Sequence, residues 1–418
     1  MDPLLREAFN ANEPAKLFST YTDWLYARLG GPFPFRLAET PLFFTKRLRD
    51  HLQTASIEIA AQLSRPATLA ALKTAIPARY AVPNMDASPH CVQVDFALVY
   101  GDGGQIEGRL VELQAFPSLY ALESLEADAW HEVLHARPGL EGDYTCFFSE
   151  DRERAMALMR RCILGGHDPQ TVAMVDFQPE KQKTAPDFTA TKLLFDVDSV
   201  CVTDIIKEGR KLFRMKDGKR VPLERIYNRM VFDELEVKNV PVPFSWNEEL
   251  DVTWCSHPNW YWAWSKYSLP HLDHPTVPRA RYLSDYFDGK EKLPEDLESY
   301  VLKPLFSFAG SGVVVDVTRE AIDAVPPERR PHYLLQRKVE YAWTIRMPGI
   351  HDGDTLGARN AVKAEVRVML MRGADGEPLQ PLLPLVRLSR GKMLGVDQNK
   401  SADVLWTGGT VGIWRRGR

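Results

Sequence analysis

Residues 300–315 read Tyr300-Val-Leu-Lys303-Pro-Leu-Phe-Ser-Phe-Ala-Gly310-Ser-Gly312-Val-Val-Val315. An apolar run delivers a lysine, a glycine-containing loop follows, and a second run of β-branched residues completes the segment. This pattern predicts two strands joined by a flexible loop. Backbone N–H groups of such a loop, together with one ammonium group, can bind a polyphosphate. The segment therefore indicates an ATP-binding hairpin, and the alternative is an ordinary β-hairpin with a lysine on its surface.

Length and composition favour a globular protein of several lobes. The chain has 418 residues, which is too long for one small core and suggests two or three lobes. It has no run of about 18 apolar residues, so we expect no membrane span. The first residues show no basic segment followed by an apolar one, so we expect no signal peptide and a cytoplasmic location. A net charge of −4 gives no reason to expect a nucleic-acid partner.

The five cysteines are widely separated in the sequence and none belongs to a CxxC pair. They are Cys91, Cys146, Cys162, Cys201 and Cys255. Their odd number and their spacing argue against a disulfide scaffold and against a structural zinc site. We expect reduced, mostly buried thiols. A nucleophilic cysteine is the alternative, but no companion motif supports it.

The hydrophobic period changes near residue 90. Residues 1–80 carry apolar side chains at spacings of three and four, which predicts helices. Residues 92–98 alternate apolar and polar side chains, residues 101–104 form a glycine-rich turn, and residues 109–116 resemble a second strand. These features predict a β-hairpin.

Helices and strands alternate after this hairpin. Patterns at 119–134 and 151–163 predict helices, patterns at 171–177 and 200–205 predict parallel strands, and the last third is mainly strands. This order indicates a mixed α/β or α+β protein, and we expect the α+β class.

Three polar residues of the predicted hairpin fall on one face. Glu112 and Gln114 are two residues apart in a strand and therefore project to the same side. If the glycine-rich turn joins the strands, Asp95 lies on the neighbouring strand. Two carboxylates and an amide oxygen suit Mg²⁺, whose remaining positions are filled by water and nucleotide phosphates. The alternative is a solvated polar face.

Other segments offer weaker signals. Lys266 lies among tryptophans and tyrosines. It is either a phosphate ligand in a site that excludes water, or a lysine whose apolar stem covers the core while its ammonium group reaches solvent. The strand that contains Gln336, Lys338 and Val339 can present backbone groups to an adenine edge. Arg229 can bind a substrate carboxylate, or it can form a structural pair with Asp233.

The order of these motifs resembles that of the ATP-grasp superfamily. In that superfamily two lysines hold the nucleotide phosphates under a glycine-rich loop, and a strand and linker bind adenine. An arginine-bearing strand follows, and then an asparagine- and glycine-rich segment. In this chain we expect residues 395–400 and 408–409 to form polar loops. Over residues 255–418 the matching positions are Lys266, Lys303, Gly310, Ser311, Gly312, Gln336, Lys338, Val339, Arg367, Asn399 and Gly408-Gly409.

The resemblance also implies a circular permutation. The usual metal-binding strands are absent after residue 399, and the Asp95–Gln114 pattern looks like those strands placed near the N-terminus. This order is similar to the glutathionylspermidine synthetase and eukaryotic glutathione synthetase groups. Nucleotide would lie between two sheet-containing lobes. The implied regions are a helical region (1–80), a permuted metal hairpin (81–140), an α/β substrate domain (141–250) and a nucleotide-binding region (251–418).

Two departures from the family pattern concern metal binding. Gln114 stands where asparagine is usual, and its extra methylene moves the amide oxygen. Phe308-Ala309 stands where the permuted members carry an acidic residue, so one ligand is missing or is supplied by Glu365 or Asp397.

The resemblance implies ATP- and Mg²⁺-dependent ligation of a small-molecule acid to an amine through an acyl phosphate. It implies that Arg367 and Arg387 stabilise the transferred phosphoryl group. The helical first 80 residues could form the surface of a homodimer, a cap over the substrate, or simply a support for the rest of the fold. Three alternatives remain: a phosphotransferase of the same superfamily, a nucleotide-binding protein without ligase activity, and a structural protein that binds no nucleotide.

Overall fold

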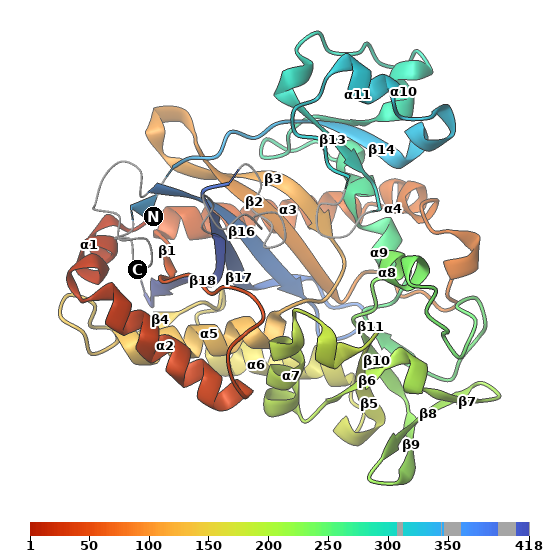
Figure 1. The fold of residues 1–418 in the computed structure, drawn as a ribbon, viewed down its shortest axis with the longest axis horizontal. Helices are drawn as coiled ribbons and strands as arrows, with labels where there is room; N and C mark the ends of the chain where they lie inside the picture. The colour runs from red at the N-terminus through yellow and green to blue at the C-terminus, as the bar shows by residue number, and fades with distance from the viewer. Residues whose placement is uncertain (307–311, 344, 347–360, 392–406, 418) are drawn as a thin grey trace.

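The computed structural model describes residues 1–306, 312–343, 345–346, 361–391 and 407–417. These residues form a large mixed sheet, three smaller sheets and the helices that cover them (Figure 1). The expected mixture of helices and strands is therefore confirmed. Within these residues, no helix combines the length and the apolar composition needed to cross a bilayer.

The elements are numbered in chain order. The helices are α1 (Pro3–Ala11), α2 (Pro14–Leu29), α3 (Lys46–Leu63), α4 (Pro66–Lys73), α5 (Tyr120–Leu134), α6 (Arg152–Leu164), α7 (Ala185–Phe195), α8 (Phe232–Val237), α9 (Trp260–Ala263), α10 (Leu283–Phe287) and α11 (Arg319–Asp323). The strands are β1 (Leu42–Phe43), β2 (Cys91–Tyr100), β3 (Ile106–Gln114), β4 (Tyr144–Thr145), β5 (Val172–Asp176), β6 (Asp198–Cys201), β7 (Ile206–Glu208), β8 (Lys211–Lys216), β9 (Lys219–Leu223), β10 (Arg225–Asn228), β11 (Thr253–Cys255), β12 (Ala280–Tyr282), β13 (Tyr300–Pro304), β14 (Tyr333–Arg337), β15 (Ile345–Arg346), β16 (Ala361–Met371), β17 (Gln380–Ser389) and β18 (Thr407–Arg415).

The large sheet joins strands from opposite ends of the chain. Its order is β1-β18-β17-β16-β2-β3, with β15 paired to β16 and β4 paired to β18. Strands β2 and β3 form the predicted hairpin, whose turn includes Gly103 (φ 72°) and Gly104 (φ 74°) in the left-handed conformation. Strand β2 also pairs antiparallel with β16, so the hairpin lies beside the C-terminal strands (Figure 1).

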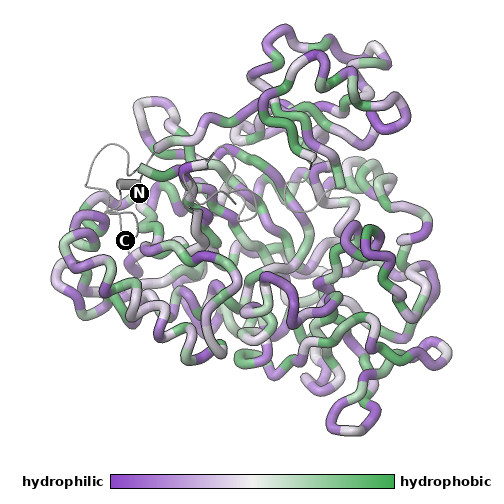
Figure 2. The backbone as a smooth tube through the Cα atoms, in the orientation of Figure 1, coloured by the Kyte–Doolittle hydropathy of each residue, from purple (hydrophilic) through white to green (hydrophobic). Residues whose placement is uncertain are grey.

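Side-chain alternation gives this sheet two different faces. Val94 and Val366 share an apolar cluster with Leu52 of α3, on one face. Met369 shares the other cluster with Trp130 of α5. Successive residues of a strand project to opposite faces, so the polar side chains of β2 and β16 lie on the α5 side. In Figure 2 hydrophobic colour follows the central strands, and hydrophilic colour marks many of the outer turns.

A second sheet, β11-β10-β5-β6, consists of parallel strands. Strand β5 agrees with the prediction for 171–177. Its partner β6 begins earlier than predicted, at Asp198, and residues 202–204 form a 3₁₀ turn instead of a strand. Helix α6 ends at Gly165 in the left-handed conformation, as expected for a glycine stop.

The third sheet, β12-β14-β13, carries the lysine of the 300–315 segment. Strand β13 forms as predicted and pairs with β14. The second β-branched run does not form a strand, because only Val314 pairs with β13, through a bridge to Leu302. Gly312 has φ 72°, and a Cβ there would lie 3.2 Å from the Pro304 ring, so both conformation and space favour glycine.

Candidate active site

A buried ion network occupies the centre of the large sheet on the α5 side. Asp95 lies opposite Arg367 across the β2–β16 pair. Its two carboxylate oxygens accept hydrogen bonds from Arg367 Nε at 2.6 Å and Nη2 at 2.7 Å, and Arg387 Nη2 donates at 2.5 Å. Asp95 is 1% exposed. Burial alone would raise the pKa of Asp95, but the charges of Arg367 and Arg387 outweigh it and hold the pKa below its usual value.

The network continues to Glu365 on β16. Glu365 accepts from Arg387 and, at 2.6 Å, from the Tyr341 hydroxyl. Burial raises the pKa of Glu365, although the charge of Arg387 opposes this shift. Burial would lower the pKa of Arg387, but the carboxylates of Glu365 and Asp95 outweigh it and raise that pKa. Arg367 and Arg387 therefore lie together around Asp95, and each already has a carboxylate partner.

Two lysines converge on Glu112 at the open edge of β3. Lys266 Nζ lies 3.9 Å from Glu112 Oε2, and Lys303 Nζ donates a 3.0 Å hydrogen bond to the backbone carbonyl of Val111. Burial lowers the pKa of Lys303 to about 8, and Glu112 partly opposes this shift while Lys266 adds to it. The two lysines that the sequence places 37 positions apart thus meet beside the predicted metal-binding hairpin.

The three predicted metal ligands lie as the hairpin prediction requires, but they are not equivalent. Asp95 pairs with Glu112, and Gln93 pairs with Gln114, across the two strands. Glu112 is partly exposed, and Arg367 Nη2 is 4.0 Å from its carboxylate. Gln114 donates its amide N–H to Gln93 Oε1 at 2.7 Å, while Gln93 donates to the Ser118 carbonyl. This chain of hydrogen bonds fixes the Gln114 amide with its oxygen directed away from Gln93.

These contacts test whether the set can hold Mg²⁺. Glu112 and the Gln114 oxygen fit a cation that takes its other ligands from water and phosphate. Asp95 does not fit, because guanidinium groups engage both of its oxygens. Two of the three predicted ligand residues are therefore compatible with Mg²⁺, and Asp95 is not.

The predicted adenine segment has an unusual buried amide. Gln336 is 2% exposed, and neither its amide nitrogen nor its amide oxygen has a hydrogen-bond partner within the part of the chain that the structure describes. It lies opposite Val301, two residues from Lys303, so Gln336 and Lys303 share one face of the small sheet. Such a group costs about 1–3 kcal/mol unless a partner satisfies it, which is the property expected of a group that awaits a ligand.

Lys338 and Val339, which follow Gln336 in the predicted adenine segment, have no comparable unsatisfied side chain within the described residues. Lys338 Nζ donates to the Glu298 carbonyl, and its backbone N–H donates to the Ser299 carbonyl at 2.8 Å. Val339 follows, half-buried, just beyond the end of β14.

Arg229 is buried and ion-paired. Its guanidinium contacts Asp187 at 2.5 Å, Thr184 at 3.1 Å and Ser118 at 3.3 Å. The sequence-based alternative of a structural aspartate pair names the wrong partner, because Asp233 instead accepts from the Tyr261 hydroxyl.

The remaining predictions fall in two groups. Gly310, Ser311 and Asn399 lie outside the described residues, as do Phe308-Ala309 and Asp397. Gly408-Gly409 was expected to belong to a polar loop, but it lies inside β18, where Gly409 pairs with Arg387. A Cβ on Gly408 would lie 2.8 Å from the Ala38 backbone nitrogen, so close packing explains that glycine.

Sequence reasoning missed Tyr341 and Gln93. Tyr341 binds Glu365 from a segment with no regular structure, so no periodicity marks it. Gln93 shares the polar face of β2 with Asp95, and the period of two residues could have identified it.

Comparisons with known proteins found a match in structure but none in sequence. No protein-family model and no curated protein matches the chain. Among solved structures it is similar to a glutathione synthetase like-effector from Globodera pallida in its apo form, with a TM-score of 0.60 and 11% identity over 95% of this chain and 96% of that chain. The chain thus has a glutathione synthetase-like fold of mixed α and β structure.

Proposed function

We propose that the protein binds ATP beside β3 and uses it to join a small-molecule carboxylate to an amine. The observation that carries the proposal is the convergence of Lys303 and Lys266 on Glu112, within a glutathione synthetase-like fold. In this proposal the fold is a circularly permuted ATP-grasp fold, in which the β2–β3 hairpin supplies the metal site. The cytoplasmic location, the homodimer and the absence of a nucleic-acid partner stay predictions.

The two lysines bind the phosphates of the nucleotide in this proposal. Lys303 is held below its usual pKa by burial, so a phosphate beside it would restore the charged form and gain a charge-assisted hydrogen bond. Gln336 shares the face of Lys303, and its unsatisfied amide supplies one donor and one acceptor for an adenine edge. Lys338 and Val339 extend that edge with backbone groups, and the loop that contains Gly310, Ser311 and Gly312 covers the phosphates. Asn399 belongs to the same proposed nucleotide site.

Glu112 and Gln114 would hold Mg²⁺, which when bound neutralises phosphate charge and orients the reacting phosphoryl group. Asp95 does not bind the metal ion in this proposal, and instead it holds Arg367 and Arg387 in position. These arginines keep a fixed positive field beside Glu112, and Arg367 Nη2 is 4.0 Å from its carboxylate. The field stabilises negative charge that develops on the transferred phosphoryl group and on the acyl phosphate.

The acceptor substrate is proposed to bind between the large sheet and residues 140–240. Arg229 lies there with Ser118 and Thr184. Its pair with Asp187 neutralises it, so a substrate carboxylate would have to open that pair.

One observation favours a second candidate, a nucleotide-binding protein without ligase activity. Asp95 is saturated by two guanidinium groups and leaves the metal site with one carboxylate from the hairpin. A phosphotransferase is the other alternative that the residues allow.

Ligand-dependent stability tests the nucleotide site. At about 100 times its dissociation constant, a non-hydrolysable ATP analogue with Mg²⁺ should raise the free energy of unfolding by roughly 2.7 kcal/mol. Lys303→Met should lose most of this increment because the phosphate loses its cation. Lys207→Met is the matched control, since Lys207 pairs with Glu248 on the β7–β9 side of the molecule. A folded wild-type protein that gains no stability would contradict nucleotide binding.

Product analysis separates the candidates. Ligation releases ADP and inorganic phosphate only when an acid and an amine are both present. A phosphorylated product without inorganic phosphate would identify a phosphotransferase. Stabilisation without turnover across a panel of acids and amines would identify the non-catalytic binder.

A further inference from the structure

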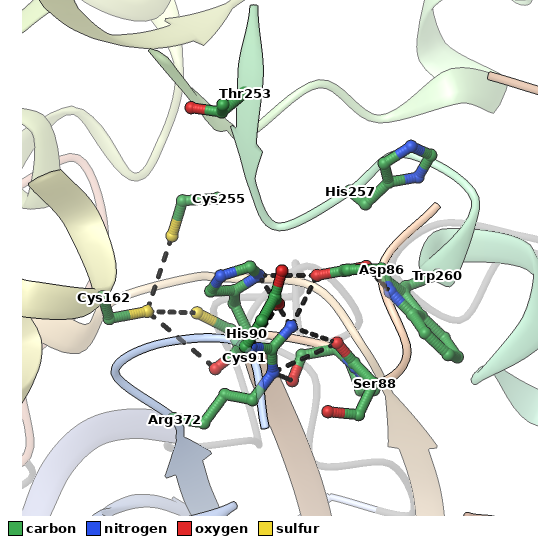
Figure 3. A network of polar contacts seen from close by, with 12 residues as sticks. Asp86, Ser88, His90, Cys91, Cys162, Thr253, Cys255, His257, Trp260 and Arg372 are labelled. Carbon is green, nitrogen blue, oxygen red and sulfur yellow. Dashed lines mark hydrogen bonds and ion pairs between the residues drawn. The ribbon is translucent and has the colours of Figure 1, made fainter. Parts of the chain in front are cut away.

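Three cysteines from distant parts of the chain meet in the interior. Cys91 begins β2, Cys162 lies in the last turn of α6, and Cys255 ends β11. Cys162 Sγ is 4.0 Å from Cys91 Sγ and 3.5 Å from Cys255 Sγ, and the three sulfurs lie within 4.8 Å of one another. Figure 3 shows Cys162 joined by dashed lines to both Cys91 and Cys255, with each side chain coming from a different element. All three residues are fully buried.

The spacing of the sulfurs matches a shared metal ion. Zinc–sulfur bonds of about 2.3 Å place the sulfurs of a tetrahedral or trigonal site about 3.8–4.0 Å apart. The Cys91–Cys162 separation of 4.0 Å lies at the upper end of this range, and the Cys162–Cys255 separation of 3.5 Å is slightly shorter. A set of three soft thiolates, with no carboxylate among them, favours Zn²⁺ or Cu⁺ over Mg²⁺.

A buried cation stands beside the thiols. Arg225 is 6% exposed and donates to the carbonyls of Cys162 at 2.8 Å and Ile163 at 3.0 Å. Its other contacts are Thr253 at 3.2 Å and His90 at 3.4 Å. Within the described residues, no carboxylate forms an ion pair with Arg225. Buried charges are normally compensated, and thiolates around a metal ion would provide the missing negative charge.

The thiol cluster also adjoins a cavity. A cavity of about 470 Å³ is lined by His90, Trp254, Arg225 and Gly165, among others. His90 precedes Cys91 and Trp254 precedes Cys255, so the cavity wall is continuous in the chain with two of the three cysteines. The carbonyl of His90 is 3.9 Å from Cys162 Sγ, so this wall of the cavity lies close to the cluster.

We propose that Cys91, Cys162 and Cys255 bind one thiophilic metal ion, Zn²⁺ or Cu⁺, in a site that joins the large sheet, α6 and the parallel sheet. Binding involves no redox step: three metal–sulfur bonds form, and three S–H protons pass to solvent. The proposal does not depend on the nucleotide site. Sequence spacing argued against structural zinc because the three ligands lie 71 and 93 residues apart, and only the fold brings them together.

Metal retention tests the site. The full-length protein is prepared with a phosphine reductant, incubated with Zn²⁺ or with Cu⁺ in separate arms, dialysed against metal-free buffer and assayed for metal. We expect about one ion per chain in one arm, loss of that ion in Cys162→Ser, and retention in Cys146→Ser. Cys146 is a fair control because it is equally buried but lies outside the cluster.

A second measurement uses the wild-type protein alone, since Cys162→Ser can unfold the protein. Titration with Cd²⁺ should produce an ultraviolet thiolate-to-metal charge-transfer band that saturates at one equivalent with the intensity of three thiolates. Folded wild-type protein that retains no Zn²⁺ or Cu⁺ and gives no such band would overturn the proposal. Equal retention by folded Cys162→Ser, or a disulfide among the three cysteines that survives the phosphine reductant in the metal-free protein, would overturn it as well.

Discussion

The arginines and the lysines of the candidate active site lie in contrasting surroundings. Arg367 and Arg387 are held by Asp95 at 2.5–2.7 Å in the middle of the large sheet. Lys303, on the edge of the small sheet, is equally enclosed but hydrogen-bonds a backbone carbonyl, and burial lowers its pKa to about 8. Each arginine already has a carboxylate partner without a ligand, although Arg387 Nε has no hydrogen-bond partner within the described residues, whereas the lysine carries a desolvation cost that a phosphate would offset.

This difference assigns separate tasks to the two groups. Guanidinium groups that are already paired with buried carboxylates change little when a ligand binds, so they act as a fixed source of charge. A partly compensated lysine beside an unsatisfied Gln336 changes its energy when a ligand arrives. Three experiments test whether the arginines and the lysine differ in this way.

The largest effect is expected for Asp95→Asn. The substitution leaves two buried guanidinium groups without a full counter-charge, and breaking such a pair typically costs about 3–5 kcal/mol. Urea unfolding of the free protein measures the loss. Asp128→Asn is the control, because Asp128 binds Arg152 in a bidentate but partly exposed pair and should cost roughly 0.2–1 kcal/mol. Equal losses in the two variants would show that the Asp95 network is no more important than a surface pair.

A smaller effect of opposite sign is expected for Gln336→Met. Removing an unsatisfied buried amide should raise the free energy of unfolding of the free protein by about 1–3 kcal/mol, while nucleotide binding weakens. Gln93→Met is the control, because both ends of the Gln93 amide are hydrogen-bonded and its removal should destabilise the protein. If Gln336→Met destabilises the free protein as Gln93→Met does, Gln336 has a partner and is not poised for a ligand.

The smallest effect is a pH dependence of Lys303. Its pKa is about 8 in the folded protein and near 10.5 when unfolded, so the unfolded state binds more protons between these values and stability rises with pH there. The penalty is fully present below pH 8. Nucleotide affinity should change the other way and fall above pH 8, approaching about tenfold per pH unit as the cation is lost. Calorimetric titration from pH 7 to 9.5 measures this fall, and a profile for Lys303→Met identical to that of the wild type would assign it to another group.

Local pattern predicted much of the scaffold. The β2–β3 hairpin follows from alternation and a glycine-rich turn, and α6 follows from its apolar period and Gly165. The pairing of Asp95 with Glu112 could not be expected in this way, because the register set by the turn would place Asp95 opposite Val111 and a bulge between Asp95 and Phe96 shifts it to Glu112. The prediction for Gly408-Gly409 was wrong because glycines that indicate a loop can also allow close packing inside a strand.

The apolar faces, the turns and the side chains that share a strand face could be read from local sequence, because they depend on residues a few positions apart. The partners of those side chains could not, because they come from distant segments that the fold brings together. Asp95 was predicted as a metal ligand, and the fold places two arginines from 272 and 292 positions away against it. The same long-range packing brings Lys266 to Glu112 and gathers three thiols that no spacing rule connects. Burial and long-range charge pairing decide the chemistry of each group, and both arise only when distant segments pack together.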